Sequence, residues 1–281
     1  MKPFFYFATL LVFFVTHQIK AAEKPNVILI LCDDVGFECF GLYGSREYKT
    51  PRLDALAANG VRFENCHSTP LCTPSRVNLM SGKSNVFNYF DFGVYPEGQP
   101  TFANYFQEHG YHTAVAGKWQ LLTGNGGITP EQAGFDTHCL WNIPGGGRNR
   151  YWNPSLVQDD KLLDMPEDSY GPDITTDFLI NFIKKNQADP FLVYFPMILP
   201  HNPFHVTPDS KDPHSADAKK NFIDMVQYID KNVGRLEDTL TSLGLREKTL
   251  IIFTSDNGTN AQLTSELNGQ PVQGGKGYRH C

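Results

Sequence analysis

Residues 26–34 read NVILILCDD, and this stretch indicates the fold. Val27–Leu31 is an unbroken run of β-branched and leucine residues, which is typical of a strand covered on both faces. The run stops at two carboxylates, Asp33 and Asp34. Because similar apolar runs alternate with helical patterns along the chain, we expect an α/β domain with a large, mostly parallel or mixed sheet flanked by helices.

The remaining elements follow from hydrophobic spacing. Further strands are predicted at Thr113–Ala116, Phe191–Phe195 and Leu250–Phe253, the last two being buried. Helices are predicted from Thr50-Pro51 to Gly60 and at Thr101–His109, Asp173–Lys185 and Ala216–Leu243. Residues 124–173 are rich in Gly, Pro, Asn and Trp, which predicts long surface loops that line a cleft.

Composition narrows the class of protein. The 281 residues are 41% hydrophobic and 19% charged, which is enough apolar material for a packed core and excludes a disordered chain, a collagen or a coiled coil. The formal net charge is −6, and no basic block is present. A nucleic-acid partner is therefore not expected. An anionic ligand would have to be held by a few placed cations.

The first 22 residues predict a targeting segment. Lys2 precedes the apolar run Phe4–Val15, and small residues, Ala21 and Ala22, close the segment. This pattern is typical of a secretory signal peptide, with an uncleaved membrane anchor as the alternative. We expect export to a periplasmic or extracellular location, or to a lysosome-like compartment in a eukaryote. Residues 23–281 then form the mature folded domain.

The six cysteines do not indicate a zinc site, because no paired C-x-x-C units are present. Cys32 lies in the first apolar run and is predicted to be a small buried hydrophobic residue. Disulfide pairing among the others cannot be deduced from the spacing.

Polar clusters follow three of the predicted strands. Asp33 and Asp34 end the first, Pro200-His201 lies beyond the second, and Asp256-Asn257 ends the third. Ligands of open α/β sheets bind at the carboxyl ends of strands, so these clusters are expected to meet in one cleft. Carboxylate and amide oxygens from two strand ends suit Ca²⁺, or alternatively Mg²⁺, better than zinc or copper. Each pair could equally be a turn or a helix cap.

Residues 72–76, Cys-Thr-Pro-Ser-Arg, carry the most specific signal. Pro74 suits a helix start, and Arg76 would lie about one turn from Cys72. A cation and a helix N-terminus beside a thiol favour the thiolate and the binding of anions. The alternative from local chemistry is a buried cysteine before a helix, with Arg76 exposed.

This stretch resembles the C-x-P-x-R signature of the type I sulfatases, which belong to the alkaline-phosphatase-like superfamily. The resemblance extends from Lys24 to the C-terminus, in the family's order of elements. It includes Asp33-Asp34 and Asp256-Asn257 as metal-ligand pairs, Gly117-Lys118-Trp119, Pro200-His201-Asn202-Pro203 and Gly274-Gly275-Lys276. Residues 23–281 would then be the N-terminal catalytic domain, incomplete at its C-terminal end and without the smaller C-terminal subdomain.

The resemblance implies hydrolysis of sulfate esters, for which a sulfated small molecule or polysaccharide is the expected substrate. Cys72 would be oxidised by a formylglycine-generating enzyme to Cα-formylglycine, whose hydrate attacks sulfur and later expels sulfate. Ca²⁺ would be bound by Asp33, Asp34, Asp256, Asn257 and the residue at position 72. Arg76, Lys118 and Lys276 would neutralise the sulfate oxygens, and His201 or Lys276 would protonate the leaving alcohol.

The sequence departs from the family pattern in two places. Gln120 stands where the G-K-W element is usually followed by histidine, and an amide cannot take a proton near neutral pH. His67, His112 and His205 are candidates to replace that histidine. The chain also stops at Cys281, soon after Lys276, where relatives continue, so an edge of the sheet would be uncovered.

Three readings follow. The first is a sulfatase acting on a sulfated carbohydrate, with Trp141, Arg148 and Trp152 in the loops that select it. The second is a phosphoester or phosphonate-ester hydrolase, because related enzymes use the same nucleophile. The third is a non-catalytic or weakly active protein that binds sulfate or sugar.

Overall fold

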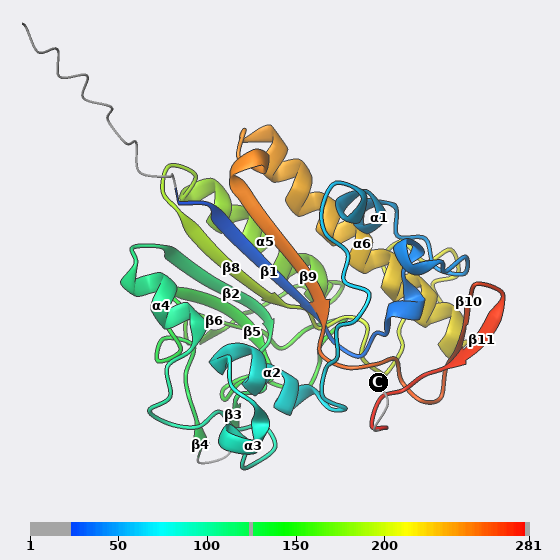
Figure 1. The fold of residues 1–281 in the computed structure, drawn as a ribbon, viewed down its shortest axis with the longest axis horizontal. Coiled ribbons are helices and arrows are strands. Elements are labelled where there is room, and N and C mark those ends of the chain that lie inside the picture. The colour runs from blue at the N-terminus through cyan, green and yellow to red at the C-terminus, as the bar shows by residue number, and fades with distance from the viewer. Residues whose placement is uncertain (1–23, 124–125, 279–281) are drawn as a thin grey trace, which may run out of the picture.

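The computed structural model describes residues 24–123 and 126–278, and seven strands of these residues form one large sheet (Figure 1). The order is β7-β6-β5-β2-β8-β1-β9. The strands are β1 (Asn26–Cys32), β2 (His112–Lys118), β5 (Thr137–Trp141), β6 (Val157–Gln158), β7 (Lys161–Leu162), β8 (Phe191–Pro196) and β9 (Thr249–Ser255). The pairs from β5 to β9 are parallel, and β6 and β7 are added antiparallel. The predicted α/β fold is confirmed.

Helices cover both faces of this sheet. On one side lie α1 (Pro51–Ala58), α5 (Gly171–Lys185) and α6 (Ala218–Ser242). On the other side lie α2 (Cys72–Ser81), α3 (Asn85–Asn88) and α4 (Phe102–Glu108). Two small hairpins complete the chain, β3 (Leu122–Thr123) with β4 (Gly126–Gly127), and β10 (Thr264–Leu267) with β11 (Gln270–Gln273).

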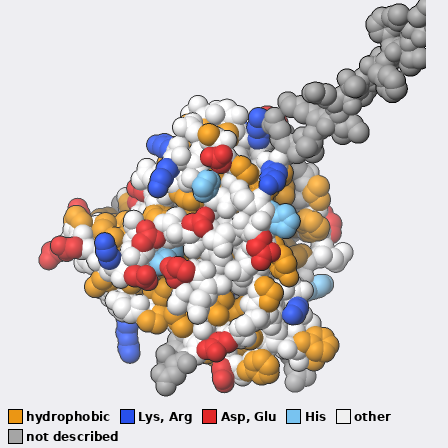
Figure 2. All heavy atoms as spheres, turned by 90° about the vertical axis from the view of Figure 1, so that its left-hand side faces the viewer, with side chains coloured by type: hydrophobic (Ala, Val, Ile, Leu, Met, Phe, Trp, Pro, Cys, Tyr) orange, Lys and Arg blue, Asp and Glu red, His pale blue; other side chains and the backbone are white. Residues whose placement is uncertain are grey.

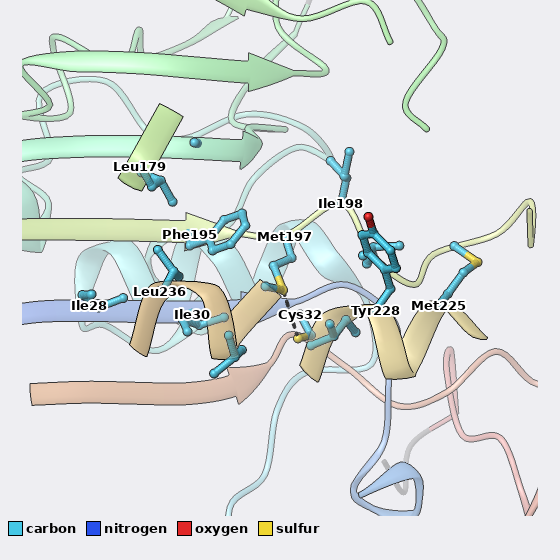
Figure 3. Close-up of a cluster of buried hydrophobic side chains, with 14 of the residues drawn as sticks. Ile28, Ile30, Cys32, Leu179, Phe195, Met197, Ile198, Met225, Tyr228 and Leu236 are labelled. Carbon is cyan, nitrogen blue, oxygen red and sulfur yellow. Dashed lines mark hydrogen bonds between the residues drawn. The ribbon is translucent and has the colours of Figure 1, made fainter. Parts of the chain in front are cut away.

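The side chains of β1 pack into two hydrophobic cores, one on each face of the sheet. Alternate residues of a strand face opposite sides of the sheet. Ile28, Ile30 and Cys32 belong to the core under α5 and α6, which Figure 3 shows with Phe195 and Leu236. Val27, Leu29 and Leu31 belong to the core under α2 and α4. Burial on both faces explains why the run has no polar residue.

Most predicted elements are present, with shifted ends. The helix at 101–109 has the capping box that its sequence suggests, because the Thr101 hydroxyl accepts from the backbone N–H groups of Ala103 and Asn104. Thr50 differs: its side chain makes no capping bond and instead accepts from Gly41 N at 3.0 Å. The prediction that residues 124–173 are surface loops is wrong for β5, which is a buried strand of the sheet. The many glycines around it made a loop the expected structure.

β9 corrects the prediction of a third strand buried on both faces. Among the described residues it pairs only with β1, and it forms the edge of the sheet. Leu250 is 53% exposed and Ile252 is 41% exposed, whereas Phe253 packs edge-to-face on Phe40. An apolar run therefore does not distinguish an edge strand from a central one.

The cysteines in the described part of the chain are Cys32, Cys39, Cys66, Cys72 and Cys139, and none of them is in a disulfide. Cys32 is fully buried against Met197, as predicted (Figure 3). The predicted signal peptide and Cys281 lie outside the described residues. No helix within residues 24–123 and 126–278 has the length and apolarity needed to cross a membrane.

Candidate active site

The carboxylates predicted to meet do meet, because backbone bonds extend the sheet past its strand ends. The Asp33 amide donates to Leu199 O at 2.9 Å, and the Asp256 amide donates to Cys32 O at 3.0 Å. Asp34 has a left-handed backbone (φ +67°), a conformation that aspartate tolerates better than most residues. Its amide donates to Asp256 Oδ1 at 3.1 Å, so the ends of β1 and β9 are joined directly.

Cys72 is the first residue of α2, and its side chain is buried against the strand ends. Its sulfur and one carboxylate oxygen each of Asp33 and Asp256 lie within 4.8 Å of one another. Arg76 follows one turn later and is completely buried, which excludes the exposed alternative. Its Nη2 lies 2.9 Å from Asp256 Oδ2 and 3.4 Å from Asp33 Oδ1, so the helix is bound to both strands.

Lys118 enters the same cluster from the end of β2. Its Nζ lies 2.8 Å from both carboxylate oxygens of Asp33. The preceding Gly117 has φ +124°, and a Cβ there would lie 1.9 Å from Pro196 O. Only glycine permits this approach of β2 to β8, which explains why a glycine precedes the lysine.

Lys276 and His201 form the other side of the cluster. Lys276 Nζ lies 2.5 Å from Asp34 Oδ2 and 3.2 Å from His201 Nε2. His201 Nε2 is 3.4 Å from Asp34 Oδ2, and its Nδ1 lies 2.6 Å from Asn202 O. The peptide bonds before Pro200 and Pro203 are cis. The structure thus gathers Asp33, Asp34, Cys72, Arg76, Lys118, His201, Asp256 and Lys276 into one cluster.

The electrostatics of the cluster are those of tightly packed opposite charges. Burial alone would raise the pKa of Asp33, but Lys118 and Arg76 hold it well below its usual value. Burial and the neighbouring Asp33 raise the pKa of Asp256 to about 7. Burial opposes the charge of Arg76, yet Asp256 and Asp33 raise its pKa, and burial lowers the pKa of His201. The buried acidic and basic side chains of the cluster therefore stabilise one another's charges.

Two orphaned oxygens test whether a hard cation fits. Asp34 Oδ1 and Asn257 Oδ1 are buried and have no hydrogen-bond partner among residues 24–123 and 126–278. Asn257 turns its amide nitrogen to Asp256 Oδ1 at 2.7 Å, which leaves its oxygen available. Buried acceptors without partners are costly, and oxygen-only donors are what Ca²⁺ and Mg²⁺ require. The residues present fit a divalent hard cation held by Asp33, Asp34, Asp256 and Asn257.

Gln120 is the residue that contacts Cys72 from the β2 side. Its amide nitrogen donates to the Cys72 sulfur at 3.2 Å. In the described part of the chain, no hydrogen bond joins Cys72 to any of the three histidines considered as replacements. His67 is exposed in a loop, His112 starts β2 and pairs with Asp189 at 3.8 Å, and His205 packs by Tyr151. Gln120 itself occupies the position beside the nucleophile.

The loops before α5 contain a residue that sequence reasoning missed. Trp141 is buried, Trp152 packs on Tyr170 at 4.9 Å, and Arg148 is exposed. The guanidinium of Arg150, and not that of Arg148, lies 4.0 Å from the centre of the Trp141 ring. No sequence signal separates the two arginines, because only the path of the loop decides which one turns inward.

A groove and scattered surface charges lie outside this site. A groove of about 680 Å³ lies along α5 and is lined by the first residues of β2 and β5 (His112 and Thr137), away from the strand ends that hold Cys72. It contains Asp136, Asp159 and Asp177. Figure 2 shows the α4 side of the molecule, where basic side chains are scattered toward the rim and acidic ones lie among them.

Comparison with known proteins gives one family. The family model described as Sulfatase matches residues 25–280. The chain is 32% identical over 190 residues to an N-acetylglucosamine-6-O-sulfatase of Bacteroides thetaiotaomicron, which covers 66% of this chain and 32% of that protein. It is 31% identical over 280 residues to arylsulfatase A of Bos taurus, covering 85% of this chain and 53% of that protein.

Solved structures agree with the fold. The crystal structure of Ps i-CgsB has a TM-score of 0.77 and 27% identity, and the match covers 91% of this chain and 63% of that one. The same protein has been solved in complex with k-i-k-neocarrahexaose. The chain spans at most about half the length of these curated relatives.

Proposed function

The chain belongs to the sulfatase family, and from this we propose that it hydrolyses sulfate esters of carbohydrates with the residue at position 72 as nucleophile. One observation carries the proposal. Cys72 begins a buried helix and lies against Asp33 and Asp256, with Arg76 fixed between the two carboxylates. A structural cysteine has no need of three buried charges around it, whereas an activated nucleophile does.

The proposed chemistry divides between the chain and two groups that it would acquire. Ca²⁺, or alternatively Mg²⁺, held by Asp33, Asp34, Asp256 and Asn257, would polarise the sulfate ester. Cα-formylglycine, made from Cys72 by a formylglycine-generating enzyme, would supply a hydrated aldehyde as the nucleophile.

The chain's own side chains bind and orient the ester. Arg76, Lys118 and Lys276 carry three positive charges beside three carboxylates, so a divalent cation and a singly charged sulfate ester would together add only one net positive charge to the cluster. Lys276 Nζ and His201 Nε2 are 3.2 Å apart, so a proton could pass between them and from either group to the leaving oxygen. Burial lowers the pKa of His201, so its imidazole is neutral at neutral pH. Burial opposes the charge of Lys276, but Asp34 raises its pKa, so Lys276 is the protonated member of the pair and the proposed proton donor.

A carbohydrate substrate is supported by the relatives. Two of the curated relatives are named as sulfatases of N-acetylglucosamine and N-acetylgalactosamine at the 6-position, and the 27% identical structure was solved in complex with k-i-k-neocarrahexaose. A 6-sulfated amino sugar is therefore the first substrate to assay.

The test combines modification and turnover. The chain, co-expressed with a formylglycine-generating enzyme, is digested, and the peptide containing position 72 is weighed by mass spectrometry. Release of sulfate from N-acetylglucosamine 6-sulfate is then compared with release of phosphate from an aryl phosphate. We expect an aldehyde at position 72 and sulfate release that is lost in Cys72→Ala. An unmodified thiol with retained sugar binding would replace this proposal by a binding role, which Gln120 at the nucleophile favours.

We also propose that the protein is exported, on the pattern of residues 1–22. N-terminal sequencing of protein recovered from outside the cytoplasm should begin near Ala22 or Glu23. A chain that retains Met1 in the cytoplasm would contradict export.

A further inference from the structure

Arg150 lies between two aromatic side chains that are each joined to the active site. Its guanidinium is 4.0 Å from the Trp141 ring centre and 5.9 Å from the Tyr151 ring centre. Trp141 ends β5 in register with Lys118. The Tyr151 hydroxyl donates to the backbone oxygens of Ile198, at 2.9 Å, and His201. Arg150 is therefore placed beside both the lysine and the histidine sides of the cleft.

The charge of Arg150 is not compensated by the protein. Among residues 24–123 and 126–278 it makes no ion pair, and its Nη1 is buried without a hydrogen-bond partner. Partly buried arginines are ordinarily paired with carboxylates, because an unpaired charge or donor is costly to bury. Every other cation of the site has a carboxylate within 3.4 Å. In the described part of the chain, Arg150 is the cation beside this site that has no carboxylate partner, and its Nη1 remains available to a ligand.

The loop that carries Arg150 is fixed in place. Gly171, the first residue of α5, donates its N–H to Tyr151 O at 2.7 Å, and a Cβ at this glycine would lie 2.3 Å from Arg150 O. Asn149 O accepts from Ser155 N at 2.8 Å. A guanidinium stacked on an indole and held by such a backbone is pre-organised, so little side-chain entropy is lost when it binds an anion.

We propose that Arg150 forms a second anion subsite, which binds a carboxylate or a further sulfate on the same sugar chain as the ester that is hydrolysed. This inference rests on the proposed function, because it assigns the specificity of that site. The sulfate that reacts is already matched by Arg76, Lys118 and Lys276, whereas Arg150 comes from the β5 side and makes none of their contacts. The planar fork of arginine suits carboxylate and sulfate equally.

The test uses the full chain after modification of position 72 and three probes. These are N-acetylglucosamine 6-sulfate, N-acetylglucosamine 3,6-disulfate, and N-acetylglucosamine 6-sulfate linked to glucuronic acid. For Arg150→Gln, we expect kcat/KM to fall about 10- to 100-fold on the disulfated probe, the uronic-acid probe or both, mainly through a higher KM. On the monosulfated sugar it should fall by less than about 2-fold. The disulfated and uronic-acid probes distinguish sulfate from carboxylate.

Two variants make the outcome decisive. Arg150→Lys should recover part of the loss, and Arg62→Ala, which removes an arginine whose side chain is 43% exposed and paired with Glu64, should change none of the three values. An equal loss on all three probes would mean that Arg150 serves the reacting sulfate or the fold, and no loss on any probe would also overturn the subsite. If the unmutated chain hydrolyses nothing, the proposed function fails separately, and calorimetric binding of the same sugars to the unmutated and Arg150→Gln chains decides the subsite.

Discussion

The side-chain amide of Gln120 donates a hydrogen bond to the sulfur of Cys72 across 3.2 Å, while its own Oε1 is buried without a partner in the described part of the chain. Gln120 has a left-handed backbone (φ +55°), which directs its side chain from the end of β2 toward the nucleophile. The amide can hold the group at position 72 in place but cannot remove its proton.

Gln120→His should therefore accelerate the release of sulfate from the residue at position 72, which requires that residue to lose a proton. We expect the steady-state rate of sulfate release by modified protein to rise by up to about 100-fold, the lower end of what a placed proton acceptor contributes. The first turnover should be little changed, so burst kinetics separate the two steps. Gln120→Asn is the control, because its shorter amide offers no proton acceptor. Equal rates for the histidine and asparagine variants would show that proton removal at this position is not limiting.

Arg76 should be essential to stability as well as to chemistry. Arg76→Met leaves Asp33 and Asp256 without their shared partner in a fully buried place, and we expect a loss of about 3–5 kcal/mol in the free energy of unfolding. Urea unfolding measures it. Arg62→Ala breaks an ion pair with Glu64 whose side chains are 43% and 64% exposed, so it should cost less than about 1 kcal/mol. Similar losses in both variants would contradict the structural role of Arg76.

A divalent cation should stabilise the fold through the orphaned oxygens. Added to metal-free protein at about 100 times its dissociation constant, Ca²⁺ is expected to add about 2.7 kcal/mol to the free energy of unfolding. Asn257→Ala removes a buried oxygen without a partner and should abolish most of the rise in melting temperature.

The control for the calcium experiment lies in a second group of potential ligands, formed by Glu131, His138 and Asp160. Asp160→Asn should leave the calcium shift unchanged, because this group is remote from Asp34 in the sheet order. A shift that survives Asn257→Ala but is lost in Asp160→Asn would place the cation elsewhere.

The edge strand β9 should promote self-association. Leu250 and Ile252 expose apolar side chains on a strand that pairs, among the described residues, only with β1. Leu250→Lys should lower concentration-dependent light scattering with little change in melting temperature, since charged residues block edge-to-edge pairing. Phe253→Lys, whose ring contacts Phe40, should lower the melting temperature instead. Unchanged scattering for Leu250→Lys would assign the association to another surface.

The sequence by itself determined the chemistry-bearing residues and most of the elements. Asp33 and Asp256 could be predicted because each follows an apolar strand, whereas Cys72 and Lys118 were predicted mainly from the resemblance to sulfatase motifs. The buried run Val27–Leu31 is explained by cores on both faces of β1. Local spacing encodes these features, since periodicity and caps depend on neighbouring residues.

The tertiary structure alone decided the rest. That β9 is an edge strand depends on which strand pairs with it, not on its own residues. That Arg150 turns inward while Arg148 stays exposed depends on how the loop is tied to Gly171 and stacked on Trp141. The separations between Asp33, Arg76 and Asp256 depend on contacts between residues as distant in the chain as Cys32 and Asp256. Such contacts are set by the packing of whole elements, which no short stretch of sequence specifies.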